Sequence, residues 1–163
     1  MKAALMIGCL AMATSLAVAQ DIVPAWLVTT PKDAPATLVY SSGTAQNIHL
    51  TCNKKSGEIT LDLTVQRRLA DHKVGQVWVD AAGIAAPWPA SVKLISGTAS
   101  ATLRGQAQAT PDGTRVTTDV STNAPVLKAF AKTGAITLIT LAEPVLPALV
   151  KPGMVRKFIG FCK

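Results

Sequence analysis

The chain has 163 residues, and its 16 lysines and arginines against nine aspartates and glutamates give a formal net charge of +7. Hydrophobic residues make up 49% of it, enough for a buried core, whereas aromatic residues make up only 4%. Because no basic run is long and no basic stripe alternates with aromatic side chains, the composition argues against nucleic-acid binding.

Residues 1–19 have the layout of a secretory signal peptide. Lys2 supplies a positive charge, an apolar run extends to about residue 13, and Ala17-Val18-Ala19 provides the small residues of a cleavage site. Cleavage is therefore predicted before Gln20. A lipoprotein site at Cys9 is the alternative, but the apolar run ahead of this cysteine would be too short.

The remainder of the chain is predicted to be exported. No later segment is apolar enough to span a membrane, which takes about 20 consecutive apolar residues. Since the leader resembles a bacterial one, the expected location is the periplasm.

Residues 20–37 contain three prolines and show no sustained periodicity. This pattern predicts an extended N-terminal arm, with Trp26 or Leu27 as a possible anchor. Residues 38–163 are predicted to form a single domain.

A β-hairpin is the clearest pattern in this domain. Apolar and polar residues alternate in residues 47–52 and again in residues 59–65, as in strands with one buried face. Matching the apolar faces predicts the register Cys52–Ile59, Leu50–Leu61 and Ile48–Leu63. The same register places His49 opposite Asp62 on the outer face and points Cys52 inward.

Further strands follow in chain order. The first, at Gln76–Asp80, is predicted to point Val77 and Val79 inward. A Pro111-Asp112-Gly113 turn predicts a second hairpin. The remaining expected strands are Ser91–Ser96, Thr98–Ala109, Val116–Val120 and Ala135–Leu141.

Two helices are predicted late in the chain. The first covers residues 123–132, with Thr122 or Asn123 as its cap and Gly134 as its stop. The second carries an apolar stripe at i, i+3, i+4 and i+7 and begins near Pro152. That stripe consists of Val155, Phe158, Ile159 and Cys162.

These elements predict an α+β fold: a twisted, mostly antiparallel sheet of six to eight strands with a short helix and a C-terminal helix. An exported chain with two remaining cysteines predicts a Cys52–Cys162 disulfide that docks the terminal helix. Reactive or free thiols are the alternatives. The lack of C-x-x-C spacing argues against an oxidoreductase.

Catalytic signals are weak. His49 and Asp62 could form an oriented imidazole, although a solvated cross-strand pair is the favoured explanation. His72 lies in a polar segment that is predicted to be a turn. No histidine spacing suits zinc, no nucleophile motif or phosphate-binding loop occurs, and no cofactor is predicted.

Binding candidates are a tryptophan and two basic pairs. Trp88 stands between two prolines in the predicted loop 81–90, where a rigid indole could serve as a binding hot spot or could plug the end of the sheet. The pairs Lys54-Lys55 and Arg67-Arg68 could contact a partner or simply be solvated.

Three segments of the chain, IHLTC with GEITLDL, VLKAFAKTGAITL and VRKFIGFCK, resemble small exported bacterial proteins of uncharacterised type. Some of those proteins are grouped with invasion-associated or secretion-accessory factors. The resemblance implies a disulfide between a strand and a C-terminal helix, and it transfers no functional residue.

The leading hypothesis is a non-enzymatic periplasmic binding or accessory module that acts through its surface on a periplasmic protein or an anionic envelope polymer. A small hydrolase with its site on the outer sheet face is one alternative. A structural envelope protein that binds anionic polymer is another.

Overall fold

The computed structural model describes residues 25–42 and 47–163. The predicted signal peptide, residues 1–19, lies outside the described residues. Nine strands form one sheet in the order β1-β2-β3-β4-β9-β8-β7-β10-β11, and every neighbouring pair is antiparallel. These strands are β1 Ala25–Thr29, β2 Ala36–Ser41, β3 Asn47–Cys52, β4 Glu58–Val65, β7 Trp88–Ser96, β8 Ala99–Thr110, β9 Gly113–Ser121, β10 Thr137–Thr140 and β11 Glu143–Val145.

The antiparallel α+β architecture is confirmed, but the sheet is larger than predicted. It has nine strands instead of six to eight. The main-sheet strands that the sequence did not predict are β1, β2 and β11, and each pairs with a neighbouring strand. β11 has three residues, one of them Pro144, and it pairs only with β10.

The predicted hairpin of β3 and β4 is confirmed with its register. Ile48 lies opposite Leu63, Leu50 opposite Leu61, and His49 opposite Asp62. All four apolar side chains of these pairs are at most 4% exposed. A slip of one residue would expose them, so burial fixes the register.

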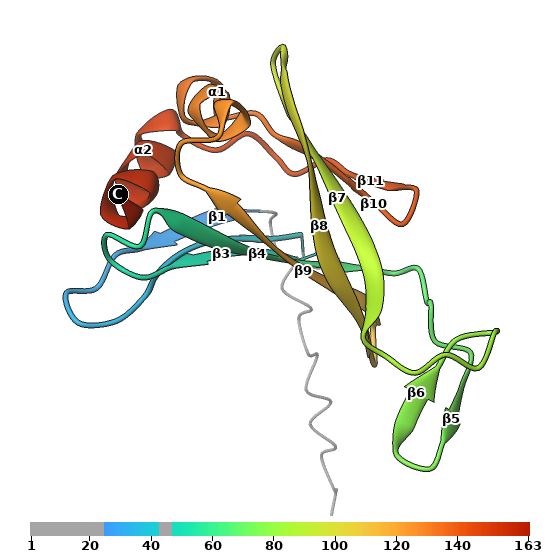
Figure 1. The fold of residues 1–163 in the computed structure, drawn as a ribbon. Helices are drawn as coiled ribbons and strands as arrows, with labels where there is room; N and C mark the ends of the chain where they lie inside the picture. The colour runs from blue at the N-terminus through green and yellow to red at the C-terminus, as the bar shows by residue number, and fades with distance from the viewer. Residues whose placement is uncertain (1–24, 43–46) are drawn as a thin grey trace, which may run out of the picture.

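The sheet curls around two helices, α1 Pro125–Thr133 and α2 Pro152–Cys162. Both lie on the same side of the sheet (Figure 1). α1 packs against β7 and β8, whereas α2 packs against β1 and β2. The helices and the inner sheet face thus share one core, in which Phe130 and Phe158 are fully buried.

The start of α1 differs from the prediction. Its N-cap is Ala124, and no side chain caps it. Thr122, one of the two predicted caps, instead donates its hydroxyl hydrogen bond to the Gly57 carbonyl at 3.1 Å. The predicted stop is confirmed, since Gly134 ends the helix in the left-handed conformation at a φ of 72°.

The predicted N-terminal arm is, from residue 25 on, part of the sheet. β1 pairs with β2 along its whole length, and β2 pairs with β3. The indole nitrogen of Trp26 donates to the Ala148 carbonyl at 2.6 Å, and its ring centroid lies 5.9 Å from that of Phe130. Trp26 is therefore the anchor, whereas Leu27 is 67% exposed.

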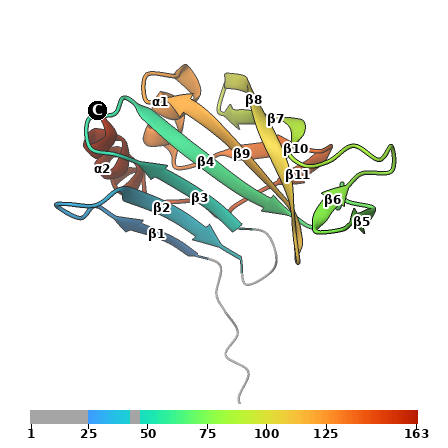
Figure 2. The ribbon, with the colours of Figure 1, turned by 60° about the horizontal axis from the view of Figure 1, so that its bottom comes forward.

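The strand predicted at 76–80 belongs to a separate two-stranded hairpin. β6 Val77–Val79 pairs with β5 His72–Val74, a segment predicted to be a turn. The hairpin projects from the end of the sheet away from the helices (Figure 2). Outside the main sheet it has little to pack against, so Val77 is 47% exposed while Val79 is buried.

Gly134 also provides a test of the fold. A methyl group there would overlap the Val150 carbonyl oxygen, and an L-residue is strained at this φ. Gly134→Ala should therefore lower the free energy of unfolding by at least about 1–2 kcal/mol. In Gly160→Ala, the added methyl group meets no described atom within 4 Å. This control substitution should raise the free energy of unfolding by up to about 1 kcal/mol. Urea denaturation measures both changes. Equal effects of the two substitutions would contradict the left-handed, closely packed conformation of Gly134.

Candidate functional site

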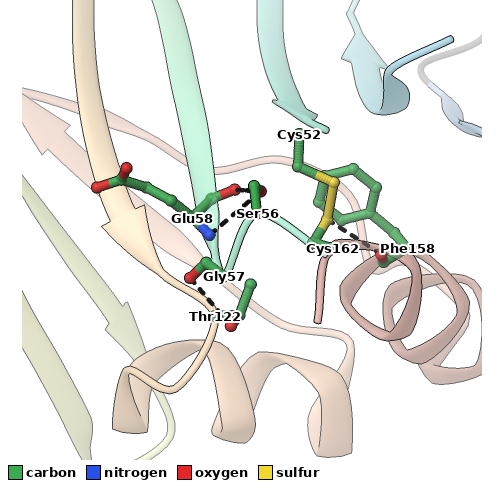
Figure 3. The surroundings of a disulfide bond; sticks show 7 residues. All are labelled: Cys52, Ser56, Gly57, Glu58, Thr122, Phe158 and Cys162. Carbon is green, nitrogen blue, oxygen red and sulfur yellow. Dashed lines mark hydrogen bonds between the residues drawn. A yellow bond between two sulfur atoms is a disulfide. The ribbon is translucent and has the colours of Figure 1, made fainter. Parts of the chain in front are cut away.

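The Cys52–Cys162 disulfide is present and joins the end of β3 to the last turn of α2 (Figure 3). The two Cα atoms lie 5.7 Å apart, within the usual range for a disulfide. Cys52 is 4% exposed and Cys162 is fully buried. The bond therefore holds the terminal helix against the sheet and is shielded from solvent.

Backbone hydrogen bonds strengthen the same junction. In the turn between β3 and β4, the amide of Lys55 donates to the Phe161 carbonyl at 3.1 Å, and that of Gly57 donates to the Cys162 carbonyl at 2.8 Å. These bonds satisfy carbonyls at the end of α2 that have no partner within the helix. They also bring Lys54 and Lys55 next to this end of the helix.

The two helices and their flanking residues form a layer of uniform charge. Residues 125–133 and 151–163 contain six basic side chains and no aspartate or glutamate, and all six basic residues are exposed. We call this set the basic helical layer; it consists of Lys128, Lys132, Lys151, Arg156, Lys157 and Lys163.

A groove runs along the seam of the two helices. It has a volume of about 160 Å³, with Lys128, Arg156 and Lys163 among its lining residues. The apolar part of the lining comes from Ala131 and Ile159. Arg156 is held in place because its guanidinium donates to the Ala131 carbonyl at 3.2 Å. Cations around an apolar floor suit a ligand that is anionic at one end and apolar at the other.

The two basic pairs predicted as contacts do not come together. Lys54 and Lys55 precede β4 and adjoin the end of the basic helical layer. Arg67 and Arg68 follow β4, at the opposite end of this eight-residue strand. The guanidinium of Arg68 donates to the Pro111 carbonyl at 2.8 Å, which fastens the segment after β4 to the turn between β8 and β9.

Trp88 is not an exposed loop residue. It begins β7, lies opposite Ala107 in β8 and is only 4% exposed. Its indole nitrogen donates to the Ile84 carbonyl at 2.9 Å. A buried indole offers no contact area to a partner. The burial of Trp88 therefore fits the other predicted role, in which the tryptophan closes the end of the sheet.

His49 and Asp62 lie opposite each other on β3 and β4, as predicted. They line an outer-face pocket of about 380 Å³ together with Asp112 and Arg115. The Asp62 carboxylate accepts a 2.6 Å hydrogen bond from Thr117, and within the described chain none joins it to His49. An imidazole without an orienting partner is poorly placed to act as a general base.

The second histidine is similarly exposed. His72 in β5 pairs with the adjacent Asp71 at 3.0 Å, and both side chains are more than half exposed. Among the described residues, no group of three or more histidine, cysteine or acidic side chains is arranged to hold a metal ion.

Comparison with known proteins yields no relative: no family model, curated protein or solved structure matches the chain. Within residues 25–42 and 47–163, no helix is long and apolar enough to cross a membrane.

Sequence reasoning missed the basic helical layer as a surface. Its residues looked like scattered charges because they occur in two segments, 125–133 and 151–163, with 17 other residues between them. A signal was present, since both segments lack acidic residues altogether. Only the packing of α1 against α2 brings the basic residues of the two segments together on one surface.

Proposed function

We propose that this chain is an exported, non-enzymatic binding module whose basic helical layer contacts an anionic component of the cell envelope. The observation that carries the proposal is the uniform charge of that layer, with six exposed cations and no carboxylate. The signal-peptide pattern of residues 1–19 and the resemblance to exported bacterial proteins support the periplasm as its location.

The charge distribution of the described chain favours this face over the others. Acidic side chains lie on the sheet and in the loops, with Asp62 on β4 and Asp119 on β9. On the outer sheet face, Asp62 and Asp112 line the same pocket as Arg115 and offset its charge. Because the helical layer has no such offset, its positive potential extends about one Debye length into solution, roughly 10 Å at 0.1 M salt.

The groove adds selectivity to this attraction. Lys128, Arg156 and Lys163 line one depression, so an anionic group bound there could meet more than one cation. The enzyme alternative has less support, since His49 and Asp62 lack the hydrogen bond that a general base would use.

Neutralising the groove should weaken binding to an anionic polymer. The triple variant Lys128→Gln, Arg156→Gln, Lys163→Gln should bind immobilised dextran sulfate on the order of tenfold to a hundredfold more weakly at low salt, because each cation near an anionic surface contributes about 1 kcal/mol. Elution in a salt gradient measures the change.

A matched control removes the same charge from the sheet. Lys93→Gln, Arg104→Gln, Arg115→Gln changes three exposed residues of β7, β8 and β9. We expect it to elute close to the parent protein. Equal losses in the two triple variants would mean that only net charge matters, and would contradict a specific helical surface.

A further inference from the structure

Two leucines stand exposed beside the basic helical layer. Leu146 is 69% and Leu149 76% exposed, and both lie in the segment between β11 and α2. They line one wall of a groove of about 330 Å³ that also includes Ile95 and Ile136. Large apolar side chains that are this exposed provide apolar surface that another apolar surface could cover.

The segment that carries the leucines is fastened to the core. The Ala148 carbonyl accepts the indole hydrogen bond of Trp26 at 2.6 Å, and the amide of Val150 donates to the Gly134 carbonyl at 3.0 Å. Val150 itself is buried. Leu149 thus lies between two anchored residues, and its exposure is a property of the fold.

Two lysines flank this apolar site. The bond between Val150 and Gly134 holds the end of α1 beside the start of α2. Lys151 is exposed and lies two residues after Leu149 in the chain. Lys132 is also exposed and lies two residues before Gly134, so the bond to Val150 brings its segment beside the leucine segment. No aspartate or glutamate occurs in residues 144–163.

We infer that this site, Leu146 and Leu149 with Lys132 and Lys151, docks the protein on the surface of an anionic phospholipid bilayer. The inference rests on the proposed function and names its ligand. Exposed leucines beside lysines match an interface in which apolar side chains enter the acyl boundary while cations meet lipid phosphates. A soluble polyanion would engage the lysines and gain nothing from the leucines, so charge and apolar area together favour a membrane.

Vesicle binding tests the inference. The purified protein is sedimented with phosphatidylcholine vesicles that contain or lack phosphatidylglycerol. The parent protein should bind only when phosphatidylglycerol is present. Leu146→Ser with Leu149→Ser should weaken this binding about tenfold, because the side chains no longer enter the apolar boundary. Lys132→Gln with Lys151→Gln should weaken it about fivefold per lysine.

Matched controls separate this site from general hydrophobicity. Val74→Ser with Ile84→Ser removes two comparably exposed apolar side chains, 61% and 58% exposed, on and near the β5–β6 hairpin. This control should bind as the parent does. Since all the substituted side chains are exposed, thermal unfolding should confirm that each variant remains folded.

The outcomes distinguish the two proposals. If the leucine variant binds phosphatidylglycerol vesicles as the parent does, insertion is excluded and the inference fails. If the parent binds dextran sulfate but no vesicles, the inference fails while the proposed function stands. If the parent binds neither, both are overturned.

Discussion

Replacing Cys52 and Cys162 together with alanine should lower the free energy of unfolding by about 2–5 kcal/mol. The disulfide joins residues with a sequence separation of 110. Its loss therefore raises the conformational entropy of the unfolded chain, which favours unfolding. It also removes the covalent attachment of α2 to β3. Urea denaturation under oxidising conditions measures the difference.

A reducing agent provides the control. It should destabilise the parent protein by a similar amount and leave the double alanine variant unchanged. Alanine is preferable to serine because both positions are buried, and a hydroxyl group there would have to find a hydrogen-bond partner. A variant as stable as the oxidised parent would show that the backbone bonds of Lys55 and Gly57 suffice to hold α2.

Trp88→Ala should cost about 3–5 kcal/mol of stability, the usual range for truncating a large buried aromatic side chain. The indole fills the core at the start of β7, and its loss also leaves the Ile84 carbonyl without this donor. Urea denaturation is again the measurement. Binding to dextran sulfate by the folded fraction should not change, because Trp88 belongs to β7 and not to the basic helical layer.

Trp78→Ala is the matched control for this substitution. Trp78 is half-buried on the β5–β6 hairpin, where the Lys73 ammonium lies 4.8 Å from its ring centroid. Its truncation should cost clearly less than that of Trp88, because Trp78 packs only partly against the core and keeps part of its surface in solvent. Equal costs for the two tryptophans would place Trp88 outside the core.

Elements with a strong period were predictable from the sequence. The alternation in β3 and β4 left only one register that buries Leu50 and Leu61 together. In α2, the spacing of Val155, Phe158 and Cys162 described one face, and all three are buried. In both cases the buried side chains themselves carry the pattern.

Elements that depend on a distant partner were not predictable. β1 is a strand because it pairs with β2 and because Trp26 reaches Ala148, a residue 122 positions later. The prolines beside Trp88 suggested a loop, but pairing with β8 draws Trp88 into the sheet. Local patterns do not specify such contacts.

The candidate surface was even less accessible. Its charges are visible in the sequence, but their convergence depends on α1 and α2 lying side by side. The exposure of Leu146 and Leu149 likewise depends on the neighbours that anchor Ala148 and Val150.

The buried disulfide also has a consequence for oxidative folding. Apart from Cys9 in the predicted leader, the sequence contains only Cys52 and Cys162. The described chain can therefore form just one intramolecular disulfide, and no mispaired isomer exists that would need reshuffling. Such a protein requires an oxidant but no disulfide isomerase, because oxidation of the two cysteines gives the native disulfide directly.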